Sequence, residues 1–181
     1  TVAHEIGHTF QYLVSADLGS IHGLNYVLGE NSSGNEWWED CANWQAHKVY
    51  PSAQFSENWG NNQNMHHMNI IHEGARYNNC YYQDWWCQLH GLNTIGRVWR
   101  EATYPEDPIQ AYMRIFGHDE QSFADEQFTG YAHIAAMDID RWQTYGQHLI
   151  GSEQQRLQEV PEAIVASHLN GETDWWIVDP A

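Results

Sequence analysis

Two histidines one helical turn apart open the chain and restrict how its first residues can fold. The sequence begins TVAHEIGHTFQYL, with Glu5 between His4 and His8. Apolar residues recur in the same stretch at the period of an α-helix, at Ala3, Ile6, Phe10, Leu13 and Val14. We therefore predict an amphipathic helix over residues 1–16, with its apolar stripe buried beside the histidine face.

The spacing of the two histidines is typical of a zinc hydrolase. Residues i and i+4 of a helix lie about 6 Å apart along its axis, so His4 and His8 can bind the same ion. Glu5 lies next to that face, where its carboxylate can take a proton from a zinc-bound water. Two solvated surface histidines would not explain Glu5. We predict His4 and His8 as zinc ligands and Glu5 as the general base.

A catalytic zinc site needs a third protein ligand, and the chain excludes one familiar way of providing it. In the pattern HExxHxxGxxH, position 11 would be glycine and position 14 histidine, but the chain has Gln11 and Val14. A glutamate from a later helix is the remaining route. The segment NEWWEDCANW supplies Glu36 and Glu39.

The residues that follow Glu39 favour it as the third ligand. Ala42 and Ala46 form a face of small side chains that would let this helix approach the first one closely. Asn43 could hydrogen-bond a zinc-bound imidazole. Glu36 stays open as an alternative, since Asp40 follows it by four residues and could support it.

These two motifs resemble those of known zinc enzymes. HEIGHTFQ followed by a helical glutamate is similar to the gluzincin class of HExxH metallopeptidases, and Trp38, Glu39, Ala42 and Trp44 match the helix that carries the third ligand. HEIGHTFQ together with WWEDCANWQA more closely resembles an uncharacterised family of secreted, avirulence-like bacterial proteins. The resemblance implies a zinc-dependent hydrolase, a metallopeptidase with Zn²⁺ as cofactor and a protein or peptide as substrate, and it favours Glu39. Asp40 stands where these peptidases usually have glycine.

The fold expected for the chain is mostly α, the helical catalytic part of an α+β gluzincin-like metallopeptidase domain. We expect residues 1–181 to be a single catalytic domain, truncated at the N-terminus, with truncation at the C-terminus left open. A second helix is predicted from near Asn35 to the residue before Pro51, because proline has no N–H to donate. Residues 23–35 and 51–69 are predicted as loops.

Further helices are predicted in the rest of the chain. Tyr77, Tyr81 and Trp85 follow one another at four-residue intervals, which indicates an aromatic helix that Gly91 ends. Shorter helical patterns follow at residues 93–103, after the pair Asp107-Pro108, at residues 122–137 and near residues 152–169. The expected N-caps are Asn93, Asp107 and Ser122.

An oxyanion intermediate would need a hydrogen-bond donor opposite the metal, and Tyr77 is our candidate for that role. A tyrosine in the hydrophobic core with its hydroxyl at the rim would look the same in sequence. Tyr77 follows a histidine-rich stretch that contains His66, His67 and His72. We considered a second metal site there, but predict a lid or wall of the cleft near the zinc.

Composition excludes several classes of partner. The chain carries 24 acidic side chains against 7 basic ones, a net charge of −17 that repels phosphate backbones and anionic lipid surfaces. No stretch approaches the roughly 20 apolar residues that span a bilayer. We therefore expect neither nucleic acid nor membrane as a partner. A secreted zinc-containing module that binds carbohydrate or protein without turnover is the alternative to an enzyme.

Cysteine and tryptophan pairs also bear on the fold. Three cysteines allow at most one disulfide, from Cys41 to Cys80 or Cys87. The three Trp-Trp pairs, at residues 37–38, 85–86 and 175–176, could stack on sugar rings, but in helices such rings are more often part of the core. We predict that they are core residues.

Overall fold

The computed structural model describes residues 2–18, 37–55, 58–65, 68–143 and 146. Contacts divide the chain into two compact units, Thr1–Tyr145 and Gly146–Ala181, and all the described helices belong to the first. The described residues are helical and contain no strand, which confirms the mostly-α prediction. The single domain over residues 1–181 stays a prediction. No helix in the described part of the chain is long and apolar enough to cross a membrane.

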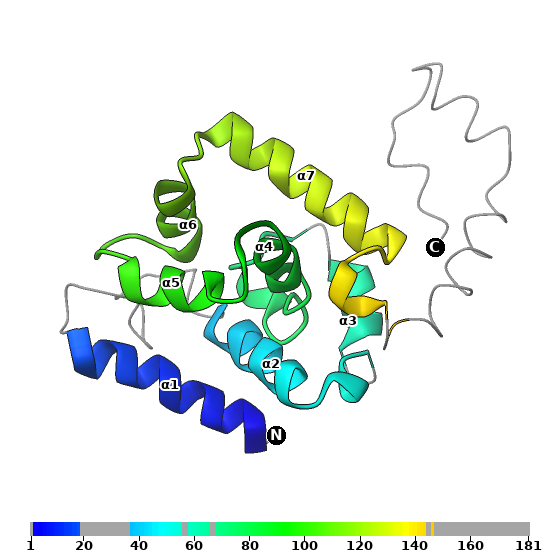
Figure 1. Cartoon of the computed structure of the whole chain (residues 1–181), viewed down its shortest axis with the longest axis horizontal. Helices are drawn as coiled ribbons and strands as arrows, with labels where there is room; N and C mark the ends of the chain where they lie inside the picture. Colours follow the sequence, from blue (N-terminus) through cyan, green and yellow to red (C-terminus); the bar gives the residue numbers. More distant parts are fainter. Residues whose placement is uncertain (1, 19–36, 56–57, 66–67, 144–145, 147–181) are drawn as a thin grey trace, which may run out of the picture. The chain divides into compact units, whose positions relative to one another are not determined.

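The described part of the chain is a succession of helices (Figure 1). In chain order they are α1 (Val2–Leu18), α2 (Trp37–Val49), η1 (Pro51–Ala53), α3 (Trp59–Met65), η2 (Glu73–Ala75), α4 (Tyr82–His90), α5 (Thr94–Glu101), α6 (Pro108–Phe116), α7 (Glu120–Ala136) and η3 (Asp140–Trp142). The three η elements are short 3₁₀ helices. The helices predicted for residues 1–16 and from Asn35 to the residue before Pro51 correspond to α1 and α2.

The core forms around α4, which lies between the other helices in Figure 1. All residues of α4 from Tyr82 to Cys87 are buried, and the helix contacts α5 and α7. Trp86 is fully buried and stacks on Tyr112 of α6 with ring centroids 3.9 Å apart. Burial of a large aromatic ring contributes roughly 3 kcal/mol, so these contacts explain why the short α4 is helical. The core prediction is confirmed for Trp37, Trp85 and Trp86, whereas Trp38 is half-buried.

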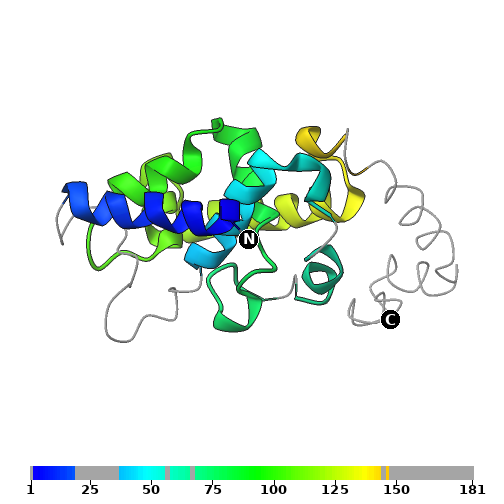
Figure 2. The ribbon, with the colours of Figure 1, turned by 90° about the horizontal axis from the view of Figure 1, so that it is seen from below.

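α1 packs against α2 at very short range, at the edge of the described helices (Figure 2). A Cβ at Gly7 would lie 2.5 Å from Oε1 of Gln45 and 3.2 Å from Cα of Ala42. Because the contact with the Ala42 backbone is tighter than a Cβ atom normally makes, any larger residue at position 7 would have to push the two helices apart by a few tenths of an ångström. The predicted face of small residues on α2 is confirmed at Ala42.

The prediction that α1 buries its apolar stripe is wrong. The side chains of Ile6, Phe10 and Leu13 are 51%, 59% and 45% exposed, whereas His4 and Gln11 are buried. The apolar period therefore identified the helix but not its buried face. The reason is that the histidine face packs on α2 through hydrogen bonds, and this arrangement turns the apolar stripe to solvent.

Three other local predictions need correction. The stretch 51–69 is not one loop, because it contains η1 and α3. The aromatic helix does not begin near Tyr77: α4 begins at Tyr82, and Tyr77 has a left-handed φ of 70° that no α-helix accepts. Gly91, with φ of 94°, ends α4 as predicted.

The N-caps are confirmed only in part. Asp107 caps α6 and accepts a hydrogen bond from the backbone N–H of Gln110. Asn93 makes no side-chain cap bond. Ser122 is not the N-cap of α7: Asp119 is, and Ser122 takes the third helical position of the same capping box. The predictions for residues 23–35 and 152–169 lie outside the described residues.

No disulfide links the three cysteines. Cys41, Cys80 and Cys87 are buried as free thiols. Burial raises the pKa of each thiol, most strongly for Cys41 and Cys80. These cysteines are therefore inert core residues rather than ligands or nucleophiles.

A buried carboxylate, that of Asp84 in α4, ties three elements together. Oδ1 accepts hydrogen bonds from Nε1 of Trp44 at 2.9 Å and from Nζ of Lys48, both in α2. Oδ2 accepts from Nε2 of Gln54 and Nε1 of Trp142, each at 2.8 Å. Burial alone would raise the pKa of Asp84, but Lys48 and the other donors outweigh it and hold the pKa below its usual value. The carboxylate is therefore charged at neutral pH.

We predict that Asp84→Asn lowers the free energy of unfolding by about 3 kcal/mol, because it leaves the Lys48 charge without its buried partner. Since the pKa of Asp84 is lowered in the fold, its contribution is present above the usual aspartate pKa and is lost as the pH falls below it. Urea unfolding measures both effects. The control is Asp125→Asn, which removes an exposed carboxylate bonded to Gln121 and should cost little. Equal losses in the two variants would contradict the prediction.

Candidate metal centre

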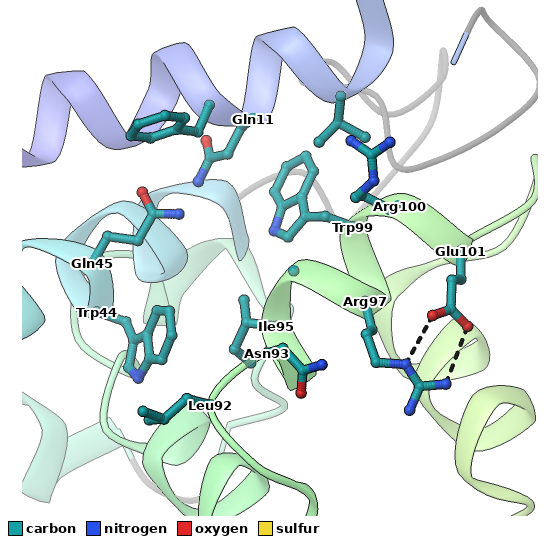
Figure 3. A pocket seen from close by; sticks show the side chains of 13 residues that line it. Gln11, Trp44, Gln45, Leu92, Asn93, Ile95, Arg97, Trp99, Arg100 and Glu101 are labelled. Carbon is teal, nitrogen blue, oxygen red and sulfur yellow. Dashed lines mark hydrogen bonds and ion pairs between the residues drawn. The ribbon is translucent and has the colours of Figure 1, made fainter. Parts of the chain in front are cut away.

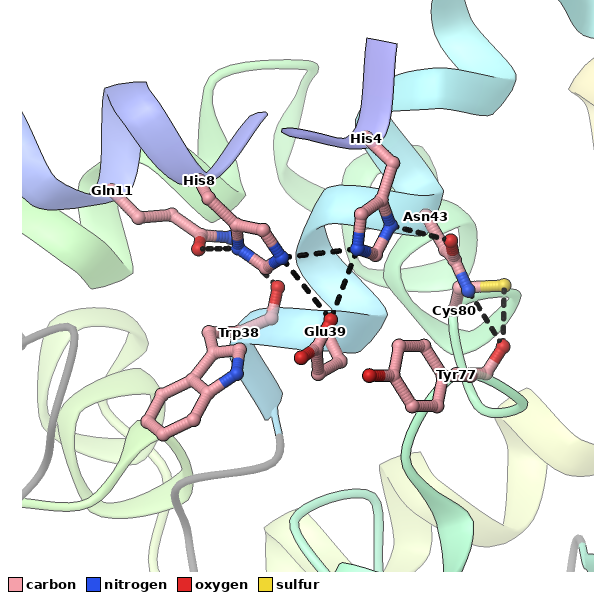
Figure 4. A network of polar contacts seen from close by, with 8 residues as sticks. All are labelled: His4, His8, Gln11, Trp38, Glu39, Asn43, Tyr77 and Cys80. Atoms are coloured by element: carbon pink, nitrogen blue, oxygen red, sulfur yellow. Dashed lines mark hydrogen bonds and ion pairs between the residues drawn. The ribbon is translucent and has the colours of Figure 1, made fainter. Parts of the chain in front are cut away.

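Three side chains from two helices converge on one point (Figure 4). Nε2 of His4 and Nε2 of His8 lie 3.0 Å apart, and Oε2 of Glu39 lies 3.0 Å from the first and 3.1 Å from the second. His4 and His8 come from α1 and Glu39 from α2. Their side chains are 11%, 12% and 15% exposed. The structure thus brings together the three residues predicted as ligands.

Asn43 fixes the orientation of the His4 ring. Its Oδ1 lies 2.7 Å from Nδ1 of His4, and its Nδ2 donates to the backbone oxygen of Tyr77 at 2.9 Å. The second bond sets which end of the amide is oxygen, so Nδ1 of His4 must carry the proton. Nε2 of neutral His4 then presents a lone pair to the cluster. This is the contact that the sequence predicted for Asn43.

Gln11 orients His8 in the same way. Its Oε1 lies 2.9 Å from Nδ1 of His8, and its Nε2 donates to the backbone oxygen of Trp38 at 2.8 Å. Nε2 of neutral His8 therefore also presents a lone pair. This role of Gln11 was not predicted from the sequence, where Gln11 served only to exclude the pattern HExxHxxGxxH. The signal was there, because a residue three positions after His8 lies on the same face of the helix.

The cluster therefore places three electron-rich atoms within hydrogen-bonding distance of one another. Two imidazole lone pairs and a carboxylate oxygen at 3.0–3.1 Å repel unless a proton or a metal ion lies among them. Ligands of a tetrahedral zinc, each about 2.0–2.2 Å from the ion, are roughly 3.3–3.5 Å apart. The residues fit a zinc ion with only a small widening of the cluster.

The predicted base, Glu5, lies on α1 one residue after His4, and its side chain is exposed. Successive residues of a helix are rotated by 100°, so Glu5 points to one side of the pair of histidines rather than away from them. Its carboxylate is open to water beside the cluster.

Tyr77 lies beside the cluster in a strained conformation. Its ring centroid is 6.0 Å from that of His4, and the side chain is 39% exposed. In Figure 4 the rings of Trp38 and Tyr77 flank Glu39. A left-handed φ costs a residue with a Cβ about 1–2 kcal/mol, which the surrounding contacts must offset. Strain of this kind is common at functional sites.

The turn that carries Tyr77 is held by α2. Asn43 binds the backbone oxygen of Tyr77, and the buried Asp40 accepts a hydrogen bond from the backbone N–H of Asn79 at 3.0 Å. Asp40 thus supports this turn instead of facing the cluster. Glu36, the alternative ligand, lies outside the described residues.

The histidine-rich stretch is described only in part. His66 and His67 are outside the described residues, and the exposed His72 accepts a hydrogen bond from the backbone N–H of Gly74 at 2.9 Å. The lid or cleft wall predicted there stays a prediction.

A pocket of about 570 Å³ lies between α1, α2 and α5 (Figure 3). Its lining combines apolar side chains, such as Phe10, Ile95 and Trp99, with the guanidiniums of Arg97 and Arg100. His4, His8 and Glu39 are not among the lining residues, but Gln11 is. The pocket therefore adjoins the residue that orients His8 without containing the cluster.

Comparison with known proteins places the chain in a family. A family of unknown function, DUF6055, matches residues 1–176. The chain belongs to the DUF6055 family. The match covers both sequence motifs and all the described helices. No curated protein and no solved structure matches the chain.

We predict that Asn43→Ala weakens zinc binding about 10–100-fold, because the His4 ring loses the acceptor that fixes its tautomer. Titration against a chelator of known affinity measures the change. Asn64→Ala, which removes an exposed amide bonded to the backbone oxygen of Gly60, is the matched control and should bind zinc normally. Unchanged affinity in a folded Asn43→Ala protein would contradict this role.

Proposed function

We propose that the protein is a zinc-dependent metallopeptidase with its ion bound by His4, His8 and Glu39. One observation carries the proposal: the Nδ1 atoms of both imidazoles face amide oxygens, so both Nε2 lone pairs and a carboxylate oxygen point at one place. Two histidines and one glutamate are a common donor set for catalytic zinc, and three protein ligands leave the fourth position for water.

Zinc bound there would supply an acidified water and a Lewis acid for the carbonyl of the scissile bond. Glu5, exposed beside the cluster, would accept the proton of the attacking water and pass it to the leaving amine. The hydroxyl of Tyr77 would donate to the developing oxyanion, since its ring lies beside His4 and is partly exposed. These are the roles that the sequence predicts for both residues.

Packing in the described residues supports this assignment. Gly7 and Ala42 allow the close approach that puts Glu39 within reach of both histidines. Asp84 fixes α2 from the side of the core, so the ligands lie on rigid elements, as precise catalytic geometry requires. The gluzincin relationship and secretion are also part of the proposal, and they rest on the resemblance of HEIGHTFQ and WWEDCANWQA alone.

We predict that Glu5→Gln lowers the rate of peptide hydrolysis by about 10²–10⁴-fold while zinc content stays unchanged, because glutamine cannot accept the proton. Cleavage of a peptide library followed by mass spectrometry, with metal analysis of the same samples, checks both parts. Glu120→Gln, at the exposed start of α7, is the control and should keep full activity. A zinc-loaded wild-type protein that cleaves no peptide would instead support a zinc-containing binding module.

The assignment of the third ligand gives a separate prediction. Glu39→Ala removes one of the three converging atoms and should lose the zinc ion of this centre, whereas Glu36→Ala should retain it. Metal content after dialysis against trace zinc measures the difference. The reverse result would transfer the ligand role to Glu36.

A further inference from the structure

A second group of two histidines and a glutamate lies among α4, α6 and α7. His90 is the last residue of α4, His118 lies in the turn between α6 and α7, and Glu126 is in α7. One ligand atom from each lies within 4.8 Å of the other two. We propose that these residues form a second binding site for a divalent transition metal such as Zn²⁺, separate from the candidate catalytic centre.

The Nε2 atoms of both histidines are buried without a hydrogen bond. Nε2 of His118 lies 3.0 Å and Nε2 of His90 lies 3.9 Å from Oε2 of Glu126. Both nitrogens are shielded from solvent, and neither contact has the geometry of a hydrogen bond. A buried polar atom without a partner is costly. A metal ion among the three atoms would satisfy both nitrogens, because each lone pair could point at the ion instead of at the carboxylate.

The surroundings hold the three side chains in place. The hydroxyl of the fully buried Tyr112 donates to Oε1 of Glu126 at 2.7 Å, which leaves Oε2 for the histidines. The ring of His90 stacks on Phe116 at 3.9 Å, and the ring of His118 is nearly parallel to Tyr112 at 5.7 Å. A hydrogen-bonded carboxylate and fixed imidazole planes are typical of the groups around a metal site.

The charge of the site suits a divalent cation. Glu126 contributes the carboxylate of this cluster, and Arg97, whose guanidinium lies over the ring of Phe116, is paired with Glu101 at 2.8 Å. This ion pair neutralises the positive charge of Arg97 near the cluster. Imidazole and carboxylate together suit zinc and neighbouring transition metals better than magnesium or calcium.

The three side chains would need only a small adjustment to hold one ion. Nε2 of His90 and Oε2 of Glu126 are 3.9 Å apart, more than the roughly 3.3–3.5 Å between two ligands of a tetrahedral zinc ion, so this pair must close slightly on binding. The aromatic rings of Tyr112, Phe116 and Phe123 enclose the cluster. A bound ion would link the end of α4 to the α6–α7 turn and to α7.

Zinc titration of the full chain by calorimetry, with metal analysis after dialysis, tests the proposal. We expect His118→Ala to bind one ion fewer per chain than the wild type, and Glu126→Gln to weaken the same ion at least tenfold. Glutamine keeps an acceptor for Tyr112, so Glu126→Gln decides the question if His118→Ala does not fold. The control is His133→Ala, which removes a histidine of α7 that is paired with the single carboxylate of Asp138 at 2.6 Å. It should keep every ion.

The two proposed centres can be tested independently with His8→Ala, which should lose only the ion of the first centre. Zinc should still raise the melting temperature of His8→Ala, and this rise should disappear when His118→Ala is added. Zinc binding that is the same in wild type, His118→Ala and Glu126→Gln would overturn the proposal. The group would then be a histidine and carboxylate cluster held by charge alone.

Discussion

The described fold depends on one buried carboxylate. Asp84 accepts hydrogen bonds from α2, from the residue after η1 and from Trp142 of η3, so elements distant in sequence are fixed to α4 by a single side chain. α2 is thereby held on its inner side by Trp44 and Lys48. Its outer side carries Glu39 and Asn43, whose positions are set by an interaction in the core.

The two histidines of α1 are oriented by amide side chains that are themselves held in place. The amides of Asn43 and Gln11 are each held by a backbone carbonyl, and each in turn presents its oxygen to one histidine. Neither His4 nor His8 therefore has to change its tautomer when a ligand binds. The side chains of such a site lose little conformational freedom when a ligand binds, which favours both the affinity and the rate of binding.

Much of the candidate site could be predicted because it depends on helix geometry alone. His4 and His8 lie one turn apart on one helix, and Glu39 and Ala42 lie within one turn of another. The position of Tyr77 could not be predicted in the same way. Tyr77 has a left-handed φ, which ends the helical pattern in which the sequence placed it. The buried face of α1 is also polar, which the apolar period did not predict. Hydrophobic patterns identify helices well, but they misidentify the buried face where hydrogen bonds decide the packing. The same limit applies to His90, His118 and Glu126, which only the tertiary fold brings together.

The buried face of α1 is polar and its exposed face is apolar, and this changes how its sequence can vary. In most amphipathic helices the apolar positions resist substitution and the polar ones accept it. Here Ile6 and Phe10 are largely exposed, whereas a glycine and two polar side chains, Gly7, His4 and Gln11, face the neighbouring helix. Drift toward polar residues at the exposed positions would leave the packing intact. A single methyl group added at Gly7 would lie 3.2 Å from Cα of Ala42 and would require the two helices to shift, so on α1 the smaller chemical change disturbs the packing more than the larger one.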